Sequence, residues 1–149
     1  MINFLKNYVL LIFLILFIGL YAVNNYFITS YKTLYKKEGI YVVGTIKTIN
    51  TFGRSGHNFV YTFNVNGKKY KSVCSTENLS PDKFNKYLGK SFLVLCLNSN
   101  IHNNRLYVSI PVNSTDDEKT LIKIVNKNIY TKRKLDSIPY PGLFWENYF

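Results

Sequence analysis

The feature that most limits how this chain can fold is an apolar run close to its N-terminus. Residues 8–23 are 16 consecutive residues without a strongly polar side chain. A helix built from this run has no polar face, so it must be buried on every side. A membrane span needs about 20 residues, and extending the run to residue 28 gives 21, with Asn24 and Asn25 near the far end. We therefore expect residues 1–31 to be a transmembrane anchor and juxtamembrane helix.

Aromatic residues stand at both ends of this run. Tyr8 begins it, and Tyr21, Tyr26 and Phe27 lie near its end, where aromatic side chains meet the membrane interface. The alternative is a cleaved signal peptide, which needs two small residues flanking one other residue after the apolar core. The candidate sites around Ala22 match that pattern poorly. The run therefore indicates an uncleaved, single-pass signal anchor.

Lysines on either side of the run bear on its orientation. Lys6 precedes it, and Lys32, Lys36 and Lys37 follow it. Read literally, the positive-inside rule places the following domain in the cytoplasm. A short N-terminus with one lysine is also the usual form of a signal anchor that exports the domain behind it. We expect the C-terminal domain on the outer side of the membrane, with the cytoplasmic orientation as the alternative.

The clearest local pattern is a β-hairpin over residues 59–75. Asn66-Gly67 is the favoured pair for a two-residue type I′ turn, because both positions need a positive φ. This turn predicts a register in which apolar residues share one face and Lys69 and Lys71 point to the other. The predicted cross-strand pairs on the apolar face are Phe63 with Tyr70, Tyr61 with Ser72, and Phe59 with Cys74.

Three further segments have strand character: residues 40–50, 91–98 and 105–112. Gly44 in the first suggests a bend or bulge, and the second is apolar on both faces, so it should be central or covered. A short helix is expected between the hairpin and residue 91, with Ser80 as N-cap, Pro81 at its first position and Gly89 closing it. Five strands predict a small antiparallel barrel or rolled sheet over residues 40–112, of SH3-like or OB-like size.

The remaining residues, 113–149, are expected to be a helical and aromatic extension. Ser114 or Thr115 can cap a C-terminal helix whose first turn is acidic, which suits the helix dipole. Apolar residues of 121–130 fall roughly on one helical face, so this helix can pack on the sheet or on a partner. The end of the chain is too apolar for a free tail, so its aromatic residues are expected to cover the open face of the barrel or to contact the membrane: Phe144, Trp145, Tyr148 and Phe149.

The chain is strongly basic, with 19 lysines and arginines against eight acidic residues and a formal charge of +11. Only three of the basic residues are arginine, whereas nucleic-acid sites rely on arginine for bidentate contacts. The hairpin aromatics point inward instead of offering bases a stacking surface, which argues against nucleic acid. Residues 40–110 hold nine basic and two acidic residues, and close to a bilayer this charge attracts anionic headgroups.

Three segments together resemble a known pattern: Gly44-x-Ile46, YTFNVNGKKY at 61–70 and GKSFLVLC at 89–96. They resemble a group of small bacterial membrane-anchored proteins of unknown function, in which a Y-x-F-x-V-x-G-K-x-Y strand precedes a G-K-x-F-x-V strand. The resemblance covers about residues 1–112. It implies one N-terminal transmembrane helix and a compact β domain, in the bacterial inner (cytoplasmic) membrane. The connection at 97–105 lacks the proline usual there.

The soft ligands do not have the spacing of a metal site. Structural zinc sites bring ligands in close pairs, whereas the nearest pair here, Cys96 and His102, has five residues between them. Cys74 and Cys96 lie in apolar strands, which raises a thiol pKa and makes a poor nucleophile. If the domain is exported, a disulfide between these two cysteines is a better interpretation than a catalytic thiol. We expect no metal and no cofactor.

No catalytic set stands out either. The contiguous carboxylates of residues 116–118 do not converge on one substrate, because neighbours on a helix point apart. The loop around Arg54 lacks the spacing of a phosphate-binding loop. It is a candidate contact loop all the same, and the candidate contact surface comprises Arg54, His57, Lys69 and Lys71.

The sequence therefore predicts a non-enzymatic binding or assembly module at a membrane surface. Its expected partners are the lipid bilayer itself, with anionic headgroups or another envelope protein as the further contact. The alternative is a cytoplasm-facing domain that binds nucleic acid or lipid headgroups.

Overall fold

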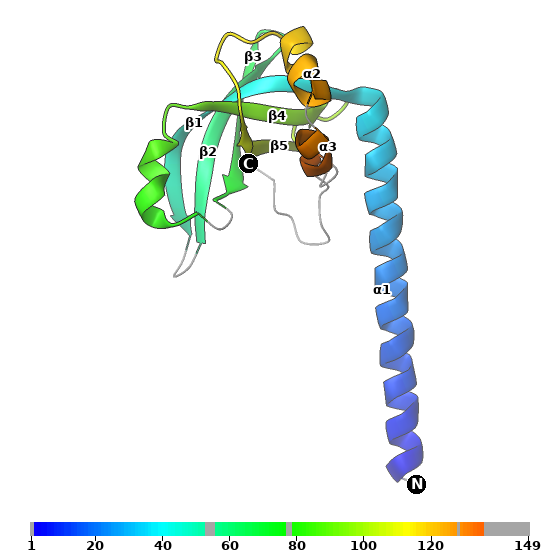
Figure 1. The fold of residues 1–149 in the computed structure, drawn as a ribbon. Helices are drawn as coiled ribbons and strands as arrows, with labels where there is room; N and C mark the ends of the chain where they lie inside the picture. Colours follow the sequence, from blue (N-terminus) through cyan, green and yellow to red (C-terminus); the bar gives the residue numbers. More distant parts are fainter. Residues whose placement is uncertain (1, 53–55, 77–78, 128, 136–149) are drawn as a thin grey trace.

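The computed structural model describes residues 2–52, 56–76, 79–127 and 129–135. These residues form a long helix, a five-stranded sheet, a short 3-10 helix and two short C-terminal helices (Figure 1). In chain order the elements are α1 (Ile2–Glu38), β1 (Gly39–Phe52), β2 (Gly56–Val65), β3 (Lys68–Ser75), η1 (Pro81–Lys86), β4 (Ser91–Leu97), β5 (Asn104–Pro111), α2 (Glu118–Lys127) and α3 (Ile129–Leu135).

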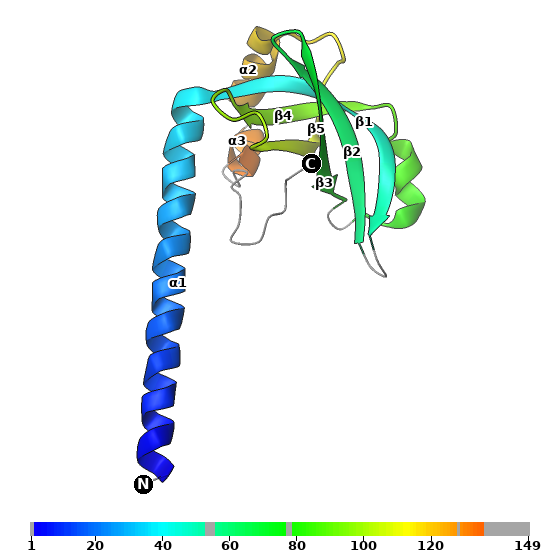
Figure 2. The same ribbon diagram turned by 180° about the vertical axis from the view of Figure 1, so that it is seen from behind.

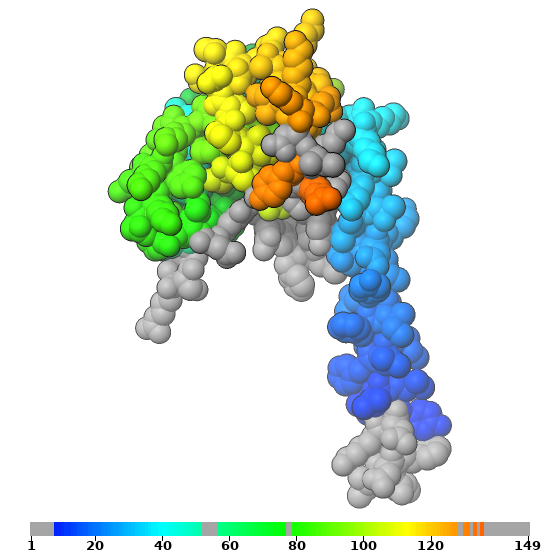
Figure 3. All heavy atoms as spheres, in the orientation of Figure 1, coloured from blue at the N-terminus to red at the C-terminus, as the bar shows by residue number. Residues whose placement is uncertain are grey.

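The predicted apolar helix is present as α1. Its segment Tyr8–Glu38 is long and apolar enough to cross a membrane, with a mean hydropathy of 2.1 in its most apolar window and none of that window buried against the protein. The N-terminal part of α1 projects beyond the body of the domain (Figure 3). The helix ends at Glu38, seven residues beyond the expected end at residue 31, because its last turns pack on the domain.

The five strands form one antiparallel sheet in the order β3-β2-β1-β4-β5. The sheet is rolled but not closed, since no ladder joins its two edge strands, β3 and β5, in the described part of the chain. The rolled form among the two predicted architectures is therefore confirmed. One buried hydrogen bond links the two halves across the interior, from the Tyr61 hydroxyl on β2 to the Asn104 Oδ1 on β5.

β1 is the strand that allows the sheet to roll. It pairs with β4 through Gly39–Thr45 and with β2 through Gly44–Phe52, so the two pairings overlap at Gly44 and Thr45. A Cβ atom on Gly44 would lie 2.4 Å from the Val94 Cγ2 and 3.0 Å from the Leu106 Cδ1. Glycine is needed here because β5 and β4 side chains close over the strand at its bend.

The hairpin has the predicted register. Phe63 pairs with Tyr70, Tyr61 with Ser72, and Phe59 with Cys74. Asn66 and Gly67 have φ values of 51° and 78°, as a type I′ turn requires.

The short helix before β4 is a 3-10 helix, and Ser80 precedes it without a side-chain cap. Gly89 adopts a φ of 73°, and its N–H donates to the Ile46 O at 2.9 Å. Gly89 therefore ends the turn as predicted and ties the chain back to β1.

Two hydrophobic cores lie on opposite faces of the sheet. The inner core fills the roll and includes Phe59, Tyr61, Phe84, Val94 and Leu106. The outer core joins β4 and β5 to the helices. Its buried members are Tyr35, Leu93, Leu95, Leu97, Tyr107, Ile110, Leu121, Val125 and Leu135.

β4 is buried along its whole length because it contributes to both cores. This confirms that the strand apolar on both faces is covered. The C-terminal region packs on the sheet through α2 and α3, and α1 reaches the same side of the sheet (Figures 1 and 2). The aromatic end of the chain lies outside the described residues.

The predicted cap of the C-terminal helix is wrong. α2 begins at Glu118, and its N-cap is Asp117, whose Oδ1 accepts the Thr120 N–H at 2.9 Å. Ser114 and Thr115 lie in the preceding turn. A carboxylate satisfies the free N–H groups and the helix dipole together, which explains why Asp117 takes this position.

Replacing Gly44 with alanine should lower the free energy of unfolding by about 1–3 kcal/mol, because the methyl group overpacks the bend against Val94 and Leu106. Thermal unfolding of the full chain in detergent, followed by the β signal in circular dichroism, measures this. Gly19→Ala is the control, since nothing lies within 4 Å of its added Cβ. Equal stability of both variants would contradict the packing at the bend.

Candidate functional site

The joint between α1 and the sheet has no flexible linker. The Tyr35 hydroxyl donates to the Asn103 O at 2.9 Å, and the Asn98 N–H donates to the Glu38 O at 3.1 Å. A Cβ on Gly39 would lie 2.3 Å from the Tyr35 O, so only glycine allows the chain to leave the helix and enter β1 in one step. The apolar helix and the domain are therefore held as one body.

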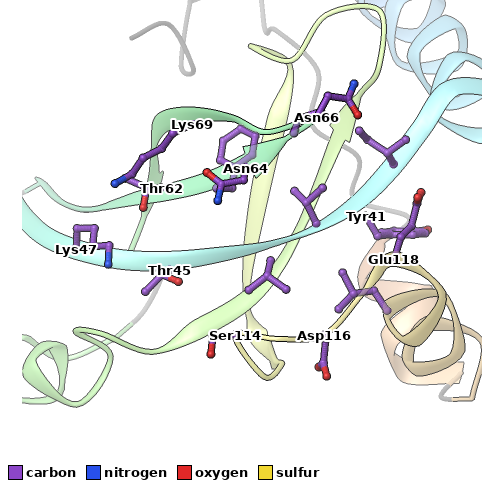
Figure 4. Close-up of a pocket in the computed structure, with 16 residues that line it drawn as sticks. Tyr41, Thr45, Lys47, Thr62, Asn64, Asn66, Lys69, Ser114, Asp116 and Glu118 are labelled. Carbon is purple, nitrogen blue, oxygen red and sulfur yellow. The ribbon is translucent and has the colours of Figure 1, made fainter.

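The outer face of the sheet is only half covered. Helices cover β4 and β5, while the outer face of β1, β2 and β3 borders a groove of about 550 Å³ against the loop before α2. That volume falls within the range of small-ligand sites. We name this feature the outer groove (Figure 4). Its lining includes Tyr41, Val43, Thr45, Lys47, Thr62, Asn64, Asn66, Lys69, Ser114, Asp116, Glu118 and Leu121.

Charges of opposite sign stand on opposite sides of the outer groove. Lys47 and Lys69 lie together at one side, near Thr62, and Asp116 and Glu118 lie on the wall formed by α2 and its loop (Figure 4). Hydroxyl and amide groups of the strands line the space between them. The groove can therefore hydrogen-bond a polar ligand and match positive and negative charges at separate points.

A β-bulge gives Lys47 its position. Ile46 pairs with Tyr61 and Thr48 pairs with Val60, so Lys47 is the extra residue on β1. Bulges re-aim side chains in this way. Lys47 is exposed and lines the outer groove.

Local hydrogen bonds shape the acidic wall. The Asn113 N–H donates to the Asp116 Oδ2 at 2.8 Å, and the Asn113 Nδ2 lies 3.4 Å from the Asp116 Oδ1. The next residue, Asp117, caps α2, and its hydrogen bonds with Thr120 lower the pKa of its carboxyl. The loop is therefore held against the start of α2.

The described members of the predicted contact surface lie in two places on the sheet. Lys69 lines the outer groove, and Lys71, also exposed, lies on the same face opposite Thr62. His57 lies at the other end of β2, half-buried, with its ring centroid 5.0 Å from that of Phe84. Arg54 lies outside the described residues.

Sequence reasoning missed Lys47, Asp116 and Glu118 as members of one site. They come from β1, the loop and α2, and only the packing of α2 on the sheet brings them to the outer groove. The sequence shows the acidic residues 116–118, but their pattern indicates only the first turn of a helix. Their position in the wall of the outer groove was therefore not predicted.

The cysteines belong to the interior. Cys96 is buried, its Sγ lies 3.8 Å from the Ile40 O, and burial raises the pKa of its thiol to about 12, with the Glu118 charge adding to the effect. Such a thiol stays protonated near neutral pH. Cys74 is half-buried on β3, and two strands separate β3 from β4 in the sheet. The disulfide between Cys74 and Cys96 stays a prediction.

Among the residues described, no three or more histidine, cysteine, aspartate or glutamate side chains gather as a metal site would require. No protein-family model matches the chain, and comparisons with curated proteins and with solved structures found no match either.

The Asp117 cap predicts a pH dependence. Because the folded pKa of this carboxyl lies below its ordinary 3.8, the cap contributes stability above that pH and loses it as the pH falls through the folded pKa. Asp117→Ala should therefore lower the urea midpoint at pH 6, and the difference from the unmodified protein should shrink at pH 3. A difference that is constant with pH would contradict the charged cap.

Proposed function

We propose that this chain is a bacterial inner-membrane protein with a single uncleaved signal anchor, and that its β domain is a non-enzymatic binding or assembly module on the outer side of the membrane. The outer groove is the proposed binding surface. The family resemblance in the sequence supports the bacterial assignment, and the apolar helix α1 supports the anchor.

One observation carries the proposal: anchor and groove share the outer core. Tyr35 of α1 and Leu121 of α2 are buried in the same hydrophobic cluster, and Leu121 also lines the outer groove. The wall of the groove is therefore built on the end of the helix that anchors the domain. A ligand in the groove is held at a set position relative to the membrane.

The ionisable side chains favour binding over catalysis. Burial raises the pKa of the Tyr41, Tyr61 and Tyr107 hydroxyls and of the Cys96 thiol. A nucleophile needs a lowered pKa or an adjacent base. These shifts keep the groups neutral, which is what packing and hydrogen bonding require of them.

The lining of the outer groove favours a polypeptide ligand. An extended segment of another envelope protein offers main-chain hydrogen-bonding groups for Thr45, Thr62 and Asn64, and side chains of both signs for the two charged walls. Opposed charges also set the direction in which such a segment lies. The competing proposal, a cytoplasmic domain for nucleic acid or headgroups, leaves the acidic wall without a role.

Topology is tested by fusing reporters to the C-terminus of the full chain. If the C-terminus is exported, the alkaline phosphatase fusion should be active, because this enzyme needs the oxidising outer compartment. The green fluorescent protein fusion should not fluoresce, because that protein folds only in the cytoplasm. A fluorescent fusion with inactive phosphatase would overturn export and favour the cytoplasmic alternative.

The groove is tested by a photo-crosslinking residue at Asn64 in intact cells. Charge reversal by Lys47→Glu with Lys69→Glu should abolish the crosslinked product, because it removes one side of the charge pattern. Lys83→Glu with Lys86→Glu is the matched control, since it changes the net charge equally at exposed positions of η1. Equal loss in both pairs would mean that net charge, and not the outer groove, governs binding.

A further inference from the structure

A second cavity of about 310 Å³ adjoins the outer groove, and we call it the end cavity. Ser114 lines both spaces. The two spaces also meet at a pair of hydroxyl groups: the Oγ1 of Thr45 in the outer groove lies 3.0 Å from the Oγ of Ser91 in the end cavity. In Figure 4, Ser114 lies on the loop before α2, on the Lys47 side of Asp116. The end cavity therefore continues the outer groove beyond the acidic wall.

Backbone hydrogen bonds tie both sides of the end cavity to the sheet. On one side, the Gly89 N–H donates to the Ile46 O at 2.9 Å, and the Ile46 N–H donates to the Lys90 O at 3.1 Å. On the other side, the Val112 N–H donates to the Ser91 O at 3.1 Å. The backbone around the end cavity is therefore fixed to β1 and β4, so that the cavity is formed before a ligand binds, as in most small-ligand sites.

The end cavity combines apolar and polar surface. Pro111 is exposed and Val112 is half-buried, and both contribute apolar surface to the lining. Lys90, Asn113 and Ser114 are exposed and contribute polar groups. Among the described residues that line the end cavity, Lys90 alone carries a charge. The cavity therefore suits a group that has an apolar part and a negative charge.

The last residue of a polypeptide chain has both of these properties. Its carboxylate and its side chain leave the same Cα atom, so the carboxylate can pair with Lys90 while the side chain packs on Pro111 and Val112. A glutamate inside a chain carries its charge at the tip of its side chain, which leaves only a short aliphatic stem for the apolar residues. Capture of a terminal carboxylate is one of the recurring modes of peptide recognition.

We propose that the ligand of the outer groove is the C-terminal segment of another polypeptide, whose terminal carboxylate binds Lys90 in the end cavity. This inference rests on the proposed function, in which the outer groove binds an extended segment of another envelope protein, and it adds which part of that protein binds. The Lys90 ammonium and the Ser114 hydroxyl are the donors for the carboxylate, and the hydrogen bond from the ammonium is charge-assisted.

The position of the end cavity also sets the direction of the ligand. Ser114 lies at the border of the two spaces, and Asp116 and Glu118 follow it along the acidic wall (Figure 4). The ligand residues that precede the terminus therefore pass Asp116 and Glu118. A basic side chain among them pairs with the wall, so we expect ligands with a basic residue shortly before an apolar C-terminal residue.

The test uses the full chain, reconstituted in nanodiscs of phosphatidylcholine and phosphatidylglycerol, as the target for two phage-displayed libraries of random heptapeptides. In the first library the random residues end in a free C-terminus. In the second library the same random residues precede the coat protein, so they carry no terminal carboxylate. Empty nanodiscs remove the phage that bind lipid. We expect enrichment only in the first library, with an apolar last residue.

The most enriched peptide is then synthesised as the free acid and as the C-terminal amide, and isothermal titration calorimetry measures both affinities. Amidation should weaken binding at least about tenfold, because the charge-assisted hydrogen bond to Lys90 is lost. In Lys90→Gln the acid and the amide should bind equally, since the charge that distinguishes them is absent. Lys86→Gln is the matched control: it removes the same charge at an exposed position of η1 outside both spaces, and it should keep the preference for the acid.

Three results would overturn the inference. They are equal enrichment of the two libraries, equal affinities of acid and amide for the unmodified chain, and a preference for the acid that persists in Lys90→Gln. In each case, weaker binding of both peptides by Lys47→Glu with Lys69→Glu would show that the outer groove is still the binding surface. Unchanged binding by that double variant, or enrichment in neither library, would overturn the polypeptide ligand of the outer groove as well.

Discussion

The structure depends on one strand that is apolar on both faces. All seven residues of β4 are buried, and the six from Phe92 to Leu97 alternate between the core inside the roll and the core beneath the helices. Without the inner contact the sheet has nothing to roll around. Without the outer contact α1, α2 and α3 have no common surface to pack on. The domain, its attachment to α1 and the wall of the outer groove all follow from this double burial.

Features set by local chemistry could be predicted from the sequence. The Asn66-Gly67 turn fixes its own register, and the two apolar faces of β4 require cover wherever the strand lies. The outer groove could not be predicted, because it depends on how α2 packs across the sheet from Lys47 and Lys69. The bulge at Lys47 and the Asp117 cap were not predicted for a related reason. Several neighbouring residues could form the bulge or cap the helix by local rules, and tertiary packing determines which residue does so.

The arrangement connects a membrane helix to a polar binding surface without a hinge. α1 passes into β1 at Gly39, and Tyr35 anchors the joint through Asn103. The same outer core holds Leu121 at the base of the acidic wall. The proposed module therefore presents its groove in a set direction, which reduces the orientational freedom that a partner must otherwise lose on binding.

The central claim is that α1 and the domain form one rigid body, and a distance distribution tests it most directly. Spin labels at Ser30→Cys on α1 and Lys69→Cys on β3, both exposed positions, can be measured by double electron–electron resonance in nanodiscs, in the Cys74→Ser background. The account predicts one narrow distance peak. A broad distribution would show a hinge between Glu38 and Gly39 and would contradict the shared outer core as the link between anchor and groove.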